Sequence, residues 1–142
     1  MRKLRELESR INYRFKNVDL LVQALTHTTY ANHNRVAHNQ VLELLGDSVM
    51  ELIVTDRLIQ IHPTEREGAL SNRRSGLVCE ASLYSYARRL NIAPLLRVSA
   101  DHEELREVRS VLADAVEALV GAAYRDGGFE AGRSTTLAIT GL

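Results

Sequence analysis

The sequence predicts an all-α protein. Leu and Ala supply 36 of the 142 residues, and the alternating runs of β-branched residues that mark strands are missing. Proline occurs only at Pro63 and Pro94, so little interrupts the helical patterns. A chain of this length is the usual size of one domain, and no linker or low-complexity tract divides it. We therefore expect residues 1–142 to form a single helical domain.

Two short helices are expected near the N-terminus. The first carries its apolar residues on one face, at Leu4, Leu7 and Ile11. Asn17 is placed to cap the second helix, because its side chain can accept a hydrogen bond from the free N–H groups of a first turn. The polar stretch over 28–39 shows no periodicity and is expected to be irregular.

The longest apolar pattern runs over 40–61 and predicts a mostly buried helix that Pro63 ends. Thr64 and Glu67 have the spacing of a capping box, so a further helix is expected to begin between them. Another helix is expected over 75–90, where apolar residues recur at helical spacing.

The C-terminal third contains two more predicted helices. Asp101 and Glu104 have a second capping-box spacing, which is expected to open a helix that continues to Tyr124. The run Asp126-Gly127-Gly128 is typical of a helix end followed by a turn. A last helix is therefore expected to begin near Glu130.

Composition and charge exclude several classes of protein. Lys plus Arg and Asp plus Glu both number 18, so net charge does not steer the chain toward nucleic acid. Cys79 is the only cysteine, which rules out an intramolecular disulfide framework, and we expect it to lie in the core of a cytoplasmic protein. No window is apolar enough for a membrane span, and the basic N-terminus lacks the apolar segment of a signal peptide.

One internal repeat indicates a site. Leu45-Gly46-Asp47-Ser48-Val49 and Leu112-Ala113-Asp114-Ala115-Val116 share the pattern Leu-small-Asp-small-Val within two apolar helices. Gly inside a helix costs about 1 kcal/mol relative to Ala, so Gly46 indicates a place where another backbone comes close. Two helices that cross at these small residues would bring Asp47 and Asp114 together, with a second carboxylate one turn away on each helix, at Glu43 and Glu117.

Four carboxylates on apolar helices repel one another and lose hydration, unless a divalent cation neutralises them or some take up protons. Oxygen ligands without His or Cys favour Mg²⁺ or Mn²⁺ over zinc, and such ions support phosphodiester hydrolysis. The alternative is that these side chains lie on solvated helix faces and pair with arginines such as Arg57 or Arg109. Spacing alone leaves both interpretations open.

Several segments carry a resemblance to a known family. Leu42-Glu43-Leu44-Leu45-Gly46-Asp47-Ser48-Val49 resembles the signature of the ribonuclease III endonuclease domain. Residues 111–122 and the run Asp126-Gly127-Gly128-Phe129-Glu130 are similar to the second acidic helix of that family and the turn after it. The other similar segments are Tyr13-Arg14-Phe15-Lys16-Asn17, Gln23-Ala24-Leu25-Thr26-His27 with Tyr30, His38-Asn39, and Glu67-Gly68-Ala69-Leu70-Ser71. The resemblance follows the family order and covers nearly the whole chain.

The resemblance implies an all-helical ribonuclease III endonuclease-domain fold that pairs as a two-fold homodimer and cleaves double-stranded RNA in RNA processing or maturation. It implies catalytic and metal-binding roles for Glu43, Asp47, Asp114 and Glu117, with Mg²⁺ as cofactor and Mn²⁺ as a substitute. Products with 5′-phosphate and 3′-hydroxyl ends are expected. No double-stranded-RNA-binding domain is expected within this chain. The alternatives are a non-catalytic RNA- or ribosome-binding scaffold of the same fold and a helical protein-interaction module.

Three features depart from the family pattern. The family usually has Glu and Arg where this chain has Gln40 and Val41, at the mouth of the site. It often has Phe where this chain has Leu44. We expect the Leu44 side chain to insert into a pocket of a partner subunit. The loop over 99–104 is shorter and more acidic than the glycine- and lysine-rich loop of the family. His27 is expected to be a hydrogen-bonded structural residue, not a metal ligand.

Overall fold

The computed structural model describes all 142 residues and confirms that the protein is all-helical. Seven α-helices and two 3₁₀ segments follow one another: α1 (Arg2–Arg10), α2 (Val18–Ala24), α3 (Thr28–Asn34), α4 (Gln40–Ile61), α5 (Glu67–Val78), α6 (Glu80–Arg89), η1 (Ala93–Leu95), η2 (Ala100–Glu107) and α7 (Arg109–Thr140). The only β-type pairing is an isolated bridge between Thr26 and Arg97. None of the helices combines the length and the apolar character that crossing a membrane requires.

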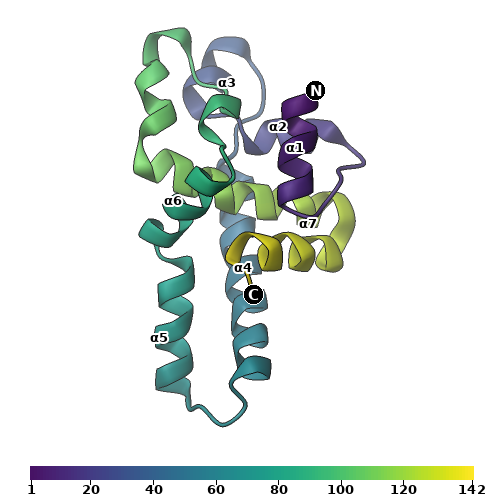
Figure 1. Cartoon of the computed structure of the whole chain (residues 1–142). Helices are drawn as coiled ribbons and strands as arrows, with labels where there is room; N and C mark the ends of the chain where they lie inside the picture. Colours follow the sequence, from purple (N-terminus) through teal and green to yellow (C-terminus); the bar gives the residue numbers. More distant parts are fainter.

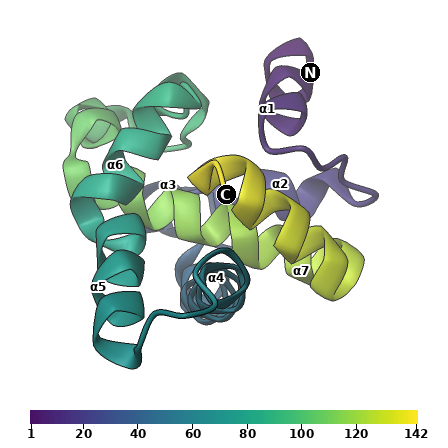
Figure 2. The same ribbon diagram turned by 60° about the horizontal axis from the view of Figure 1, so that its bottom comes forward.

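Helix α7 lies at the centre of the molecule. Figures 1 and 2 show α4 on one side of it and α1 on the other, and α2 and α6 also pack against it. Gly128 interrupts the helix with a positive φ of 79°, a conformation that glycine adopts without a steric penalty. The part that follows folds back beside the first part (Figure 2). This is the turn predicted at residues 126–128.

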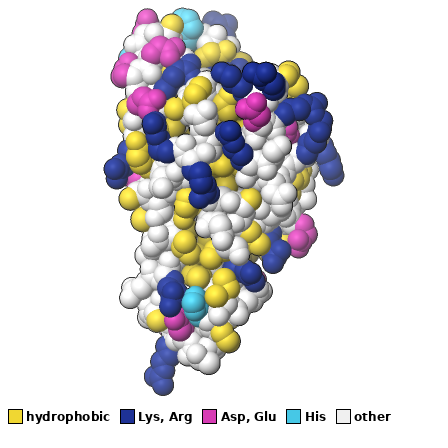
Figure 3. All heavy atoms as spheres, in the orientation of Figure 1, with side chains coloured by type: hydrophobic (Ala, Val, Ile, Leu, Met, Phe, Trp, Pro, Cys, Tyr) yellow, Lys and Arg dark blue, Asp and Glu magenta, His cyan; other side chains and the backbone are white.

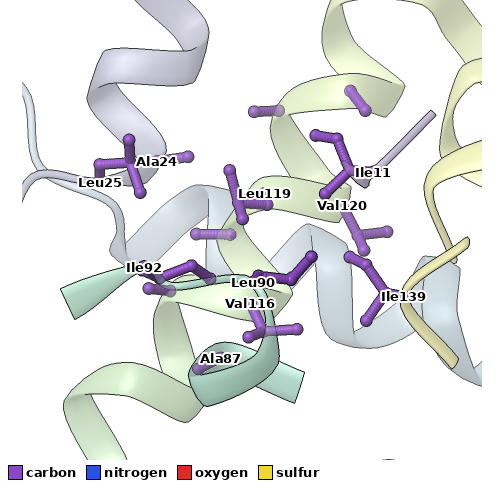
Figure 4. Packing of buried hydrophobic residues seen from close by; sticks show 14 of the residues in the cluster. Ile11, Ala24, Leu25, Ala87, Leu90, Ile92, Val116, Leu119, Val120 and Ile139 are labelled. Atoms are coloured by element: carbon purple, nitrogen blue, oxygen red, sulfur yellow. The ribbon is translucent and has the colours of Figure 1, made fainter. Parts of the chain in front are cut away.

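A continuous core of 28 buried residues surrounds α7. Figure 4 shows side chains that are far apart in the sequence meeting around Val116 and Leu119 of this helix. Ile11 and Leu90 come from two other segments, Ile139 comes from the part of α7 after Gly128, and all three are fully or almost fully buried. The predicted first helix and the Asn17 cap of α2 are both confirmed, the latter by a hydrogen bond of 3.0 Å from the Asp19 N–H to the Asn17 side chain.

The most extensive helix contact joins α4 and α7, which meet backbone to backbone. A Cβ atom on Gly46 would overlap the carbonyl oxygen of Glu117, and one on Gly121 would overlap the carbonyl oxygen of Leu42. Only glycine therefore fits at either position without moving a helix. The close approach predicted at Gly46 is confirmed, but its counterpart on α7 is Gly121, about one to two turns beyond the small residues of the repeat at 112–116 that were predicted to meet it.

The stretch over 28–39, predicted to be irregular, contains helix α3, so that prediction is wrong. The N-cap of α3 is His27, whose Nδ1 accepts the Thr29 N–H at 3.1 Å. Histidine is not among the side chains that usually cap helices, so the sequence carried no recognisable start signal. Arg35 ends the helix in the left-handed region, with φ 55°.

Neither predicted capping box forms. Helix α5 begins at Glu67, and its N-cap is Arg66, not Thr64. Residues 100–107 form the 3₁₀ segment η2, and α7 begins after the extended Val108. The predicted single helix from 101 to 124 is therefore wrong over its first turns, because the backbone leaves the helical region at His102 (φ −133°, ψ 40°) and again at Val108 (φ −76°, ψ 127°).

The predicted helix over 75–90 is wrong as a single element. Cys79 adopts an extended conformation (φ −68°, ψ 161°) between α5 and α6. This break lets α5 lie along α4 while α6 packs on α7 (Figure 1). Cys79 itself is exposed, which contradicts its predicted place in the core.

Candidate metal centre

The four carboxylates selected from the sequence lie where α4 crosses α7. Glu43 and Asp47 are one turn apart on α4, and Asp114 and Glu117 are one turn apart on α7. Carboxylate oxygens of Glu43, Asp114 and Glu117 all lie within 4.8 Å of one another. Asp47 is outside this group of three, but it is close enough to Glu117 to raise the pKa of that carboxyl group. The structure thus brings all four side chains to one crossing.

Three of the four carboxylates, those of Glu43, Asp47 and Glu117, border an open groove of about 360 Å³. Its lining residues are Gln40, Glu43, Leu44, Asp47 and Glu117. The three clustered carboxylates are half-buried, whereas Asp47 is exposed at the rim. The groove is therefore accessible from solvent on one side and bounded by packed helix on the other. Gln40, which was predicted to lie at the mouth of the site, is one of the residues that line this groove.

Burial and mutual repulsion raise the pKa of both glutamates. The pKa of Glu43 rises to about 7, first because burial disfavours the charged form and then because of the charge and hydrogen bond of Asp114. The pKa of Glu117 rises to about 8, again chiefly through burial, with Asp47 as its main neighbour. Near neutral pH the cluster therefore shares protons instead of carrying four full negative charges.

Asp114 has two neighbours that the sequence analysis did not identify at the site. Burial raises the pKa of Asp114, the hydrogen bond with Glu43 opposes this rise, and the charge of Glu80 adds to it. Glu80 stands in the first turn of α6, directly after the break at Cys79. His27 is also close enough to act on the Asp114 charge, but its ring is fixed by Thr29, as expected of a structural residue.

No cation of the chain neutralises the cluster. None of the ion pairs in the structure includes any of its four carboxylates. Of the two arginines considered as partners, Arg57 points to the carbonyl of Leu142 and to Gln60, and Arg109 lies over the Tyr84 ring. A close group of unpaired carboxylate oxygens, without His or Cys donors, fits a hard divalent cation.

A second groove, mainly apolar, adjoins the acidic one. It has a volume of about 600 Å³ and is lined by Leu20, Gln23, Val41, Leu42, Leu44, Leu45, Ser48 and Arg125. Val41 and Leu44 are the most exposed of its apolar residues, at 71% and 70%. Leu44 borders both grooves, so the apolar surface is continuous with the carboxylate site.

The fold and the site together define a class: an all-helical domain whose acidic cluster is built on two crossing helices. A ribonuclease-III-like family model matches residues 17–139. The Ribonuclease 3 of Clostridium tetani is 42% identical over 137 residues, which cover 94% of this chain and 58% of that protein. The Ribonuclease 3 of Desulforamulus reducens is 43% identical over 136 residues, which cover 92% and 55%. The chain therefore belongs to the ribonuclease-III-like family.

Solved structures agree on the fold. The nuclease domain of ribonuclease III from Campylobacter jejuni superimposes with a TM-score of 0.88 at 34% identity, covering 99% of this chain and 95% of that one. A second structure of the same domain, described for flexibility in a region involved in dimer formation, gives 0.87 at 35% identity, covering 95% and 94%. This chain spans less than two thirds of the length of the full-length relatives above.

Proposed function

We propose that this chain is the catalytic domain of a metal-dependent endoribonuclease that hydrolyses phosphodiester bonds of double-stranded RNA and leaves 5′-phosphate and 3′-hydroxyl ends. The observation that carries the proposal is the convergence of Glu43, Asp114 and Glu117 within 4.8 Å, without a cation of the chain to neutralise them. A scaffold that only binds RNA does not need a half-buried group of carboxylates, because such a group repels itself when it is ionised and does not attract RNA phosphates. Residues 1–142, with their continuous core, act in this proposal as one domain.

The metal-binding and catalytic roles belong to Glu43, Asp47, Asp114 and Glu117, which would hold Mg²⁺ or, in its place, Mn²⁺. Such an ion supplies charge for the attacked phosphate and lowers the pKa of bound water. The carboxylates must be ionised to act as ligands, so Glu43 and Glu117 give up the protons that their raised pKa values retain. The walls of α4 and α7 then keep the four groups in one orientation.

The acidic groove and the apolar groove beside it support a duplex substrate and a dimeric assembly. Exposed Leu44 and Val41 form an apolar surface beside the acidic groove, and such a surface is best covered by a second copy of the same patch. A two-fold pair would place two acidic grooves along one face, suited to cutting both strands of an A-form duplex. We place this activity in the cytoplasm, which the free and exposed Cys79 supports.

A cleavage assay tests the function. The chain is incubated with a long RNA duplex, with and without Mg²⁺, beside Asp47→Asn and the control Asp56→Asn. Asp56 is exposed on the same helix and binds only Gln60. We expect metal-dependent cleavage, a loss of at least about a hundredfold in Asp47→Asn, and activity close to wild type in the control. A folded protein that binds the duplex with Mg²⁺ present and never cuts it would instead be a scaffold.

A second measurement tests the assembly. We expect Leu44→Asp to place an unpaired charge in the interface at a cost of roughly several kcal/mol, so that the variant is monomeric and cuts duplexes poorly. Leu52→Asp is the matched control, because Leu52 is 58% exposed on the same helix but lies outside the apolar groove. Sedimentation velocity over a concentration series gives the oligomeric state. A wild type that stays monomeric while cutting both strands would refute the dimer.

A further inference from the structure

Positive charge is concentrated at the N-terminus of the chain. Residues 1–16 contain six of the 18 Lys and Arg side chains but only two of the 18 acids, so this segment carries +4 while the remaining residues carry −4. Figure 3 shows Lys and Arg side chains gathered at the upper right of the visible face, over α1 and the segment after it. A chain without net charge thus presents one locally basic surface.

A polar hollow of about 340 Å³ lies within this surface. Its lining residues are Arg5, Glu8, Ser9, Asn12, Tyr13 and Arg14. Arg5 and Arg14 are exposed, and neither forms an ion pair or a side-chain hydrogen bond. The one acid in the hollow, Glu8, accepts the Phe15 N–H at 2.6 Å, so its carboxylate is engaged by the backbone. Two guanidinium groups are therefore free for an external anion.

The wall of the hollow is fixed in place by contacts with α7. Asp126 accepts hydrogen bonds from the Tyr13 hydroxyl at 2.6 Å and from the Lys16 and Asn17 N–H groups at 2.7 and 2.9 Å. Ser134 is bonded to the side chain and the carbonyl of Asn12. Because these contacts hold residues 12–17 against the core, the hollow is preorganised before any ligand arrives.

We propose that this hollow is a second RNA contact, in which Arg5 and Arg14 bind backbone phosphates. Guanidinium groups match phosphate oxygens through paired N–H donors, and phosphate contacts supply most of the affinity of proteins for nucleic acid. A membrane surface fits less well, because a helix that lies on lipid presents an apolar face. The apolar face of α1 is buried in the core, where Leu7 and the C-cap residue Ile11 are both 0% exposed.

The hollow lies on the side of α7 away from the helix that carries Glu43 and Asp47. In Figures 1 and 2, α1 and α4 flank α7 on opposite sides. An RNA segment bound by Arg5 and Arg14 is therefore not the segment cut at the same subunit's acidic groove. The contact would hold a structured RNA outside its cleavage site, which contributes to affinity and leaves the chemical step unchanged. It rests on the proposed function only for the choice of RNA as ligand.

The test measures binding without divalent cations, so that it does not depend on cleavage. Fluorescence anisotropy is recorded with a labelled RNA duplex bearing 5′-hydroxyl ends, at several KCl concentrations. Arg5→Gln/Arg14→Gln is compared with Arg35→Gln/Arg66→Gln, which removes two arginines elsewhere that are also exposed and unpaired. Arg5→Lys/Arg14→Lys keeps the charge. Thermal melting confirms that each variant is folded.

We expect Arg5→Gln/Arg14→Gln to raise the Kd about tenfold and to lower the slope of log K against log salt by about two, as for two lost phosphate contacts. The control pair should change the Kd less than twofold, and the Lys pair should recover most of the slope. Equal losses in the two Gln pairs would overturn the proposal. So would an unchanged affinity for RNA together with weaker binding to phosphatidylserine vesicles, which would make the surface a membrane contact.

Discussion

Helix α7 carries acids in two opposite environments. Asp114 and Glu117, near its start, face Glu43 and one another with no cation beside them, and burial and repulsion raise their pKa values. Asp126, about three turns further on, is surrounded by donors from Tyr13 and the residues after it. Burial would raise the pKa of Asp126, but the hydrogen bonds and the charge of Lys16 lower it below its ordinary value.

The charged form of Asp126 therefore stabilises the fold, whereas the charged forms of Asp114 and Glu117 destabilise it. A carboxylate that accepts several N–H and O–H bonds favours the native state in its charged form. A carboxylate among carboxylates disfavours that state until it is protonated or neutralised from outside. Residue type and helix are the same in both places, so the surrounding donors decide the role.

The largest effect on stability is expected from adding a side chain where α4 and α7 are in backbone contact. Gly46→Ala places a methyl group on the carbonyl oxygen of Glu117 and must push α4 and α7 apart. We expect a loss of about 3 kcal/mol or more in the free energy of unfolding, measured by urea denaturation. Gly76→Ala is the control, because a Cβ there meets nothing within 4 Å and a helical Ala is favoured over Gly. A Gly46→Ala variant as stable as this control would show that the helices are not held at contact distance.

A smaller effect is expected at the acid surrounded by donors. Asp126→Ala leaves the Tyr13 hydroxyl and the Lys16 and Asn17 N–H groups without their acceptor, so we expect a loss of about 2 kcal/mol. Because the folded-state pKa of Asp126 lies below its ordinary value of 3.8, this contribution is complete at neutral pH and is lost in acid as pH falls through the lowered pKa. Asp101→Ala, on the exposed segment η2, should change stability little. Equal losses in the two variants would remove the contrast between the two acidic regions.

The smallest effect is expected in the pH dependence of stability at the four-carboxylate site, where stability falls as pH rises, opposite to the contribution of Asp126. Glu43 and Glu117 keep protons in the folded chain up to about pH 7 and 8, whereas unfolded glutamates ionise near 4.5. The folded state thus binds more protons over this interval, and without divalent cations the Tm should fall as pH rises from about 5 to 9. Glu43→Gln/Glu117→Gln should flatten that dependence. An identical slope in the wild type and the double variant would contradict the shifted pKa values.

The elements with strong periodicity were predictable from the sequence. The bounds of α4 and the close approach at Gly46 are confirmed, because a long apolar pattern predicts a buried helix and a glycine in mid-helix indicates a close helix contact. The convergence of the regions around Asp47 and Asp114 followed from the same repeat. The catalytic roles of the four acids and the dimer remain predictions that the experiments above address.

The remaining elements were set by tertiary contacts that no local pattern records. Cys79 breaks α5 from α6 without glycine or proline, since each helix packs on a different partner. His27 caps α3 in place of the usual Ser, Thr, Asp or Asn. The effect of the Glu80 charge on Asp114, which lies 34 positions further along the chain, could be seen only in three dimensions.

The glycine contact at the crossing also has a consequence for the order of folding. Gly46 and Glu117 lie roughly 70 positions apart in the chain, so their contact closes a long loop and carries a large entropic cost. Until that loop closes, Glu43 and Asp47 have no partners from α7, and an incompletely folded chain offers only isolated carboxylates. A divalent cation would therefore bind the folded chain in preference to the unfolded one, and its concentration would set how much stability it adds to the fold.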